Sequence, residues 1–276
     1  MRNLITRAIT GIIFISLIIS SFFLPWYVFA VIFLFFTIVA IYEYTHIARQ
    51  SGSSPQFAST MTLAVTIFVA AQITHTLPIF SAVLLLLSAI LFLVVFIVEL
   101  YRKKEKPLLN IATTLLPLAW IVTPFALSGL WAFRLGSANT VLAIFIFIWL
   151  YDTLAYCTGS LFGKHRLFER ISPKKSWEGF ILSLILTTVI AAFFVKIPYF
   201  ATALPNTSLA WIGFALTIII SSTFGDLVES LFKRSANVKD SGTIFPGHGG
   251  ILDRFDSFFF ALPAGFVYYG ILTILC

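Results

Sequence analysis

Charged residues are scarce in this sequence. Only 11% of its 276 residues are Asp, Glu, Lys or Arg, whereas about a quarter is usual in a soluble domain. Cysteine is scarcer still, because Cys157 and Cys276 are the only two, and they cannot build a disulfide framework or a Cys-x-x-Cys metal site. The HExxH and GxSxG motifs are also absent. These absences exclude a disulfide-rich secreted scaffold and an ordinary soluble enzyme.

Apolar residues are what the sequence has in excess. They make up 59% of the chain, 31 of them are Phe, and the mean hydropathy is +1.01. A helix needs about 20 apolar residues to cross a bilayer. Nine such runs are present, at 8–24, 27–48, 57–77, 79–100, 108–130, 138–160, 179–197, 206–232 and 256–275. The runs are continuous and do not alternate with polar residues, which excludes an outer-membrane barrel. The sequence therefore predicts an all-α polytopic integral membrane protein with about nine transmembrane helices, organised as a single transmembrane domain over residues 1–276.

The first apolar run resembles a signal peptide, because Arg2 and Arg7 precede it. No small-x-small cleavage pattern follows, and the next run begins almost at once. We therefore expect the first run to remain in the protein as a membrane helix.

The positive charges indicate an orientation. If the N-terminus is cytoplasmic and nine runs cross, sixteen of the eighteen Lys and Arg residues lie inside, and only Arg134 and Lys196 lie outside. Such an excess is typical of cytoplasmic loops, and it explains the net charge of +7 without nucleic-acid binding, which we do not expect. All eleven acids lie on the same side. An active site facing the cytoplasm would account for that bias.

One polar segment lies between the last two runs. Asp226, Glu229, Ser230, Lys233 and Arg234 are spaced so that they line one stripe of a helix continuing the eighth run. Carboxylates and cations would thus share one face at the membrane surface.

Three carboxylates of this segment suit a metal ion. Asp253 and Asp256 are three residues apart at the start of the ninth run, near a positive helix end that favours acids. Together with Asp226 they could bind a hard divalent cation such as Mg²⁺, which usually takes a few carboxylates and substrate phosphates.

A structural alternative exists for the same residues. Asp226 could pair with Lys233 or Arg234, and Asp253 with Arg254, in a network that only holds two helices together. The turn at 246–250 argues against it, because three glycines and a proline surround His248. Glycines allow backbone N–H groups to approach an anion closely, which favours phosphate chemistry.

A second polar segment follows the sixth run. Asp152 lies within that run, where an ionisable side chain is costly and indicates function, and Tyr156 and Gly159 share its helix face. Lys174 and Lys175 could bind phosphate. The alternative for these two lysines is an orienting role in a cytoplasmic loop.

The segment 230–256 resembles the signature of the CDP-diacylglycerol synthases, also called phosphatidate cytidylyltransferases. The matching residues are Ser230, Lys233, Arg234, Lys239, Asp240, Gly242, Pro246, His248, Gly249, Gly250, Asp253, Arg254, Phe255 and Asp256. The segments 152–164 and 172–179 also resemble this family. The match covers about 60 residues and several motifs.

The resemblance implies a reaction in which CTP and phosphatidic acid give CDP-diacylglycerol and pyrophosphate. It also implies a homodimer with a cytoplasm-facing active site. The distribution of basic residues predicts a cytoplasmic N-terminus, and we expect the protein in the bacterial inner membrane. The resemblance further implies Mg²⁺ on Asp226, Asp253 and Asp256, with a monovalent cation such as K⁺ beside it.

The same resemblance implies roles for the other polar residues. Lys233 joins the three acids as a catalytic residue. The residues expected to bind substrate are Asp152, Lys174, Lys175, Ser230, Arg234, Lys239, Asp240, His248, Gly249, Gly250 and Arg254.

Two other functions remain open from the sequence. One is a CTP-dependent enzyme acting on another lipid, such as a polyprenol kinase or an archaeal CDP-lipid synthase. The other is a transporter, although its acids would be expected near the membrane midplane and these acids cluster at one face.

Overall fold

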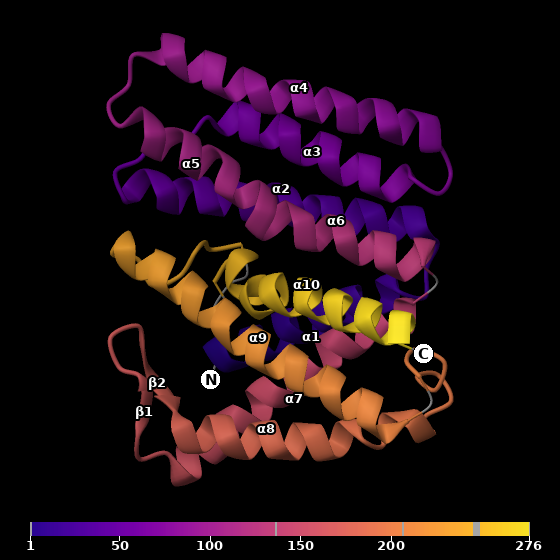
Figure 1. The fold of residues 1–276 in the computed structure, drawn as a ribbon. Helices are drawn as coiled ribbons and strands as arrows, with labels where there is room; N and C mark the ends of the chain where they lie inside the picture. Colours follow the sequence, from indigo (N-terminus) through magenta and orange to yellow (C-terminus); the bar gives the residue numbers. More distant parts are fainter. Residues whose placement is uncertain (1, 136, 206, 245–248, 276) are drawn as a thin grey trace. The chain divides into compact units, whose positions relative to one another are not determined.

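The computed structural model describes residues 2–135, 137–205, 207–244 and 249–275, and it is built almost entirely from helices (Figure 1). Their bounds are α1 Arg2–Ser21, α2 Trp26–Gln50, α3 Phe57–Ile73, α4 Pro78–Arg102, α5 Pro107–Pro117, α6 Thr123–Gly129, α7 Ala138–Phe162, α8 Trp177–Ala191, α9 Ser208–Ser235 and α10 Leu252–Leu275. The all-α polytopic class is therefore confirmed. It follows directly from the long apolar runs.

Seven of the described helical segments are long and apolar enough to cross a membrane. They are Trp26–Gln50, Pro78–Arg102, Pro107–Arg134, Ala138–Phe162, Trp177–Lys196, Ser208–Ser235 and Leu252–Ile274. Two further apolar helices, Ile9–Ser21 and Phe57–Ile73, are shorter. All nine apolar runs thus form helices, while the crossing of all nine stays a prediction.

The chain forms two compact units. The first unit contains Met1–Gly136 and Phe232–Phe255, and the second contains Ser137–Leu231 and Asp256–Cys276. Helices α9 and α10 contribute to both. The prediction of a single domain over the whole chain stays a prediction.

Aromatic packing forms the core of the first unit. Three of its buried rings are Phe33 of α2, Phe125 of α6 and Phe255 of α10. The rings of Phe125 and Phe255 lie 4.8 Å apart edge to face, and Phe33 lies 5.8 Å from Phe125. Because lipid tails are as apolar as these rings, close van der Waals packing and not exclusion of water holds such helices together.

The fifth apolar run is an irregular helix. Two π-helical turns, Leu118–Val122 and Leu130–Arg134, flank α6. Pro117 precedes the first turn and Pro124 follows it, and each lacks the N–H that a regular helix would use. The Gln72 amide of α3 donates to the Ala126 carbonyl at 3.1 Å. That bond anchors the irregular helix to α3.

A small β-hairpin links α7 and α8 in the second unit. Strands β1 (Arg166–Phe168) and β2 (Ser172–Ser176) pair antiparallel, with Arg166 opposite Ser176. Ser176 ends β2 and caps α8, because its hydroxyl accepts the Gly179 N–H at 3.2 Å. The sequence predicts only a polar loop here. The hairpin instead places the two signature lysines on a defined strand in the connection between α7 and α8 (Figure 1).

Candidate active site

An ion pair joins β2 to α9 in the second unit. The Lys175 ammonium lies 2.5 Å from Asp226 Oδ2, and both side chains are about three-quarters buried. The Ser230 hydroxyl donates to Asp226 Oδ1 at 3.2 Å from one turn further along α9. Asp226 and Ser230 therefore lie on one face of α9, as predicted, and Lys175 of β2 contacts Asp226 on that face.

The charge of Asp226 keeps Lys175 protonated. Burial alone would lower the pKa of the Lys175 ammonium, but attraction to Asp226 and their hydrogen bond outweigh it. The pKa of Lys175 therefore lies above its usual value of 10.5. A permanent cation at this position suits an anionic ligand.

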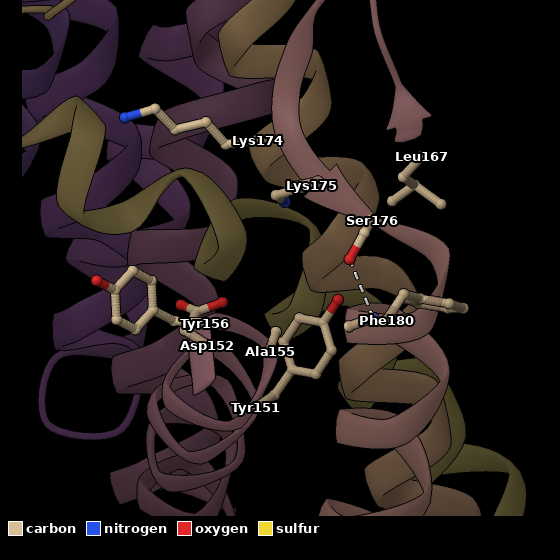
Figure 2. Close-up of a pocket in the computed structure, with 10 residues that line it drawn as sticks. Tyr151, Asp152, Ala155, Tyr156, Leu167, Lys174, Lys175, Ser176 and Phe180 are labelled. Atoms are coloured by element: carbon tan, nitrogen blue, oxygen red, sulfur yellow. Dashed lines mark hydrogen bonds between the residues drawn. The ribbon is translucent and has the colours of Figure 1, made fainter. Parts of the chain in front are cut away.

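A cavity of about 190 Å³ opens beside this pair (Figure 2). Figure 2 shows Asp152 on α7 and Lys174 on β2 among the residues around it. Leu167 and Phe180 add apolar walls. The structure therefore brings three predicted residues, Asp152, Lys174 and Lys175, to one cavity. Cationic and apolar side chains thus line the same cavity, and a lipid phosphate would need both for its charged head and its apolar part.

Tyr151 is a lining residue that the sequence reasoning missed. Its hydroxyl is 2.8 Å from the hydroxyl of Thr223 on α9, and its side chain is buried. This hydrogen bond ties the α7 wall of the cavity to α9 three residues before Asp226. No sequence signal distinguishes Tyr151 or Thr223, because their two runs contain several other hydroxyl side chains.

A second ion pair lies in the first unit, at the start of α10. The Lys233 ammonium is 2.7 Å from Asp253 Oδ1, and the two side chains are only 12% and 8% exposed. Asp253 Oδ2 also accepts the backbone N–H groups of Ser241 and Gly250, each at 2.8 Å. The glycine-rich turn therefore does bring a backbone N–H to an anion, and the anion is the Asp253 carboxylate.

Glu43 of α2 is a second residue that the sequence reasoning missed. It is 2% exposed. Its carboxylate accepts the N–H groups of Ile251 at 3.0 Å and Leu252 at 2.8 Å, and Ser241 Oγ lies 2.9 Å away. Glu43 thus satisfies the first N–H groups of α10. The only signal in the sequence was a rare acid inside an apolar run.

Asp256 belongs to the second unit. The α10 backbone at Asp256 and Ser257 lies so close to Gly225 that a side chain there would overlap it. Asp226 is the next residue of α9 after Gly225. It therefore lies beside this close contact between α9 and α10. Asp256 Oδ1 accepts the N–H of Ser257 at 2.6 Å.

Lys239 and Asp240 are exposed on the wall of another cavity in the first unit. This cavity has a volume of about 520 Å³, and α2 supplies its opposite wall, including His46 and Gln50. A volume of this order suits a small-molecule ligand.

The remaining predicted residues are spread more widely. Arg234 is exposed and donates to the Val238 carbonyl at 3.4 Å, and Arg254 is also exposed. Gly249 has a φ of +83°, which only glycine adopts easily. His248 lies outside the described residues.

The structure pairs Asp226 and Asp253 differently from the structural alternative above. Its ion pairs join Asp226 to Lys175 and Asp253 to Lys233. In the residues that the structure describes, no three His, Cys, Asp or Glu side chains gather into a metal-binding cluster. The chemistry of the donors nevertheless fits Mg²⁺. Asp226 is 27% exposed, and its hard oxygens suit an ion that takes its remaining ligands from phosphate and water.

Comparisons with known proteins agree with the signature. A family model described as "Cytidylyltransferase family" matches residues 5–272. A "Phosphatidate cytidylyltransferase" of Staphylococcus saprophyticus is 48% identical over 132 residues, which is 47% of this chain and 48% of the relative. Its namesake in Staphylococcus haemolyticus is 48% identical over 138 residues, 48% of this chain and 50% of the relative. The chain thus spans about half the length of the curated relatives it matches.

Proposed function

Because this chain belongs to the cytidylyltransferase family, we propose that it is a phosphatidate cytidylyltransferase that converts CTP and phosphatidate into CDP-diacylglycerol and pyrophosphate. The observation that carries the proposal is a pair of lysine–aspartate contacts, Lys175 with Asp226 and Lys233 with Asp253. All four residues lie in or beside the signature segments. The names of the relatives support the choice of lipid.

The lipid phosphate needs little activation, because it is already a nucleophile. Its oxygen forms a bond to the α-phosphorus of CTP while the bond from that phosphorus to the bridging oxygen breaks. The electron pair leaves with pyrophosphate. The main barrier is repulsion between two polyanions, and fixed ammonium groups lower it by neutralising the charge that develops.

The lysines have distinct surroundings for that task. Lys174 and Lys175 flank the cavity that has apolar walls, so we assign them to the lipid phosphate. Lys233 of α9 pairs with Asp253 of α10, and the loop between these helices carries Lys239 and Asp240. We therefore assign these four residues to the nucleotide. No covalent enzyme intermediate is needed.

We also propose Mg²⁺ as cofactor, with a monovalent cation such as K⁺ beside it. Asp226, Asp253 and Asp256 would hold these ions, as the resemblance implies. Bound Mg²⁺ would supply charge neutralisation at the phosphate oxygens. The protein's part is to hold each carboxylate in place through the hydroxyl, N–H and ammonium donors described above.

The setting proposed for the reaction is the bacterial cell membrane, with a homodimer whose active sites face the cytoplasm. The distribution of basic residues supports this orientation. The apolar faces of the helices support the bilayer location.

Labelled CTP tests the proposal and separates it from the alternatives. Purified protein is incubated with Mg²⁺, CTP labelled at the α- or γ-phosphate, and one lipid: phosphatidate, a polyprenol, or the phosphate of an archaeal ether lipid. Phosphatidate should take up the α-label while pyrophosphate is released. Transfer of the γ-label to polyprenol would identify a kinase instead, and preference for the ether lipid would identify the archaeal type. No CTP consumption with any lipid would contradict an enzymatic function.

A further inference from the structure

We infer that Glu43 is a positioning residue for the proposed reaction. It fixes the loop segment at Ser241 and the start of α10, and these two segments hold Asp253 in place. The inference rests on the proposed function. It concerns a residue of α2, outside every signature segment, and it involves only contacts within the first unit.

The first contact is between α2 and the start of α10. The Glu43 carboxylate accepts the N–H of Ile251 at 3.0 Å and that of Leu252 at 2.8 Å. The first N–H groups of a helix have no partner within it, and a negative charge there is favoured. Glu43 therefore sets where α10 begins, and Asp253 is the next residue of that helix.

The second contact runs through Ser241. Its hydroxyl oxygen is 2.9 Å from Glu43 Oε2 and 2.9 Å from Asp253 Oδ2, and its N–H donates to the same Asp253 oxygen at 2.8 Å. One hydroxyl carries one proton, so it can donate to only one carboxylate at a time. The positions of the two carboxylates are thus coupled through a single side chain.

The packing leaves little freedom for this arrangement. A side chain at Gly250 would overlap both Glu43 oxygens and the Ser241 hydroxyl, and one at Gly242 would overlap Glu43. Lys233 holds the other oxygen of Asp253 at 2.7 Å. Asp253 is therefore fixed on one side by its lysine and on the other by a loop that Glu43 clamps.

A second buried glutamate in the same unit provides a matched control. Glu99 of α4 is 5% exposed and accepts hydrogen bonds from Gln56, Asn110 and Arg102 at 2.7–2.9 Å. Its partners come from α4, α5 and the segment before α3, and none belongs to a signature segment. Glu99 thus matches Glu43 in burial and in accepting three hydrogen bonds, but none of these three partners lies in the segment 241–253.

The test compares Glu43→Gln with Glu99→Gln in the purified full-length protein. Glutamine keeps the shape of glutamate but has one acceptor oxygen, so an N–H donor at the loop or helix start loses its acceptor. Hydrogen exchange at residues 250–252 should become faster in Glu43→Gln and stay unchanged in Glu99→Gln. The kcat with CTP and phosphatidate should fall by about 10- to 100-fold in Glu43→Gln, as misplacement of a reacting group does. Its KM for phosphatidate should stay within about twofold.

Ser241 supplies a second variant in case Glu43→Gln does not fold. Ser241→Ala removes the bridge and leaves both contacts of Glu43 with the α10 start, so it should fold and lose kcat several-fold. Ser241→Thr restores a hydroxyl and should recover part of the loss. If Glu43 and Ser241 had only a structural role, thermal stability would fall in all of these variants and in Glu99→Gln. The kcat would then not fall selectively in the Glu43 and Ser241 variants.

Three results would overturn the inference or the function beneath it. Unchanged exchange at 250–252 in Glu43→Gln would show that the clamp does not exist. Faster exchange with unchanged kcat would show that the clamp does not position a reacting group. A wild-type protein that makes no CDP-lipid would instead refute the proposed function, while the exchange measurement would still decide whether Glu43 clamps the loop.

Discussion

A buried ion pair stabilises a protein only while both partners are present. Lys233 and Asp253 are 12% and 8% exposed, so removing one charge takes this partner from the other in a poorly solvated place. Such a loss typically costs about 3–5 kcal/mol. Asp253 lies near a helix end, where substitutions are often tolerated, but its burial and its hydrogen bonds with Ser241 and Gly250 make a substitution here costly.

The first prediction separates charge pairing from chemistry at this pair. Asp253→Asn should be nearly inactive and should unfold at a lower temperature than the wild type. Adding Lys233→Met removes the ammonium that faces residue 253 and should recover much of the thermal stability in detergent, while CTP turnover stays lost. Recovery of turnover together with stability in the double variant would identify the pair as a structural salt bridge.

The second prediction concerns an exposed lysine. Lys174→Gln should lower the rate by about 10²–10³, by analogy with the loss of one donor to a transition-state anion. Thermal stability should barely change, because the side chain is exposed. Lys174→Arg should recover only part of the rate, since its planar group donates differently. Lys104→Gln is the control, because this exposed lysine lies outside the signature. Equal losses at Lys104 and Lys174 would mean that the charges act only on topology.

The third prediction concerns the pH dependence of the Lys175–Asp226 pair. The pKa of Lys175 is raised above 10.5 by Asp226, so the folded state holds this proton more tightly than the unfolded state. The resulting stability is fully present below pH 10 and is lost as pH rises through the raised pKa. The difference in thermal midpoint between wild type and Lys175→Met should therefore be constant from pH 7 to about pH 9.5. A difference that shrinks between pH 7 and 9 would contradict the raised pKa.

At the scale of elements, the sequence predicted the helices well, because long apolar runs have few other stable states in a bilayer. It missed the β1–β2 hairpin, since two short polar strands carry no periodic signal. It also missed Glu43, whose partner Ser241 is 198 residues away in the chain. Lys175 and Asp226 could be named from the family resemblance. Their pairing could not, because it depends on how β2 packs against α9.

The fourth prediction tests the close approach of α9 and α10. Gly225 touches the α10 backbone at Asp256, whereas a methyl group at Gly270 would meet nothing within 4 Å. Gly225→Ala should lower both the unfolding temperature and the rate, because the two helices must move apart beside Asp226. Gly270→Ala should leave the rate unchanged and could raise stability, since alanine favours a helix by about 1 kcal/mol. Thermal unfolding and CTP turnover in detergent measure both effects, and equal behaviour of the two variants would refute this packing argument.

At the scale of the whole molecule, the number of crossings depends on the two shorter apolar helices. Helix α3 has 17 residues, which span about 25 Å at 1.5 Å per residue. A hydrocarbon core is about 30 Å thick, and a short helix can still cross it if the bilayer thins locally. The excess of basic residues on one side favours crossing.

The fifth prediction therefore concerns single cysteines placed on each side of α3, in protein whose native cysteines are replaced by serine. Ser51 lies between α2 and α3, and Thr76 follows α3. Both are exposed, and so are Glu105 and Arg170 in later loops. A reagent that cannot cross the membrane of intact cells should label Thr76→Cys. It should spare Ser51→Cys, Glu105→Cys and Arg170→Cys until the cells are opened. Labelling of Ser51→Cys together with Thr76→Cys would show that α3 does not cross. Labelling of Glu105→Cys or Arg170→Cys in intact cells would reverse the orientation and place the lysine–aspartate pairs on the side of the membrane that has no CTP.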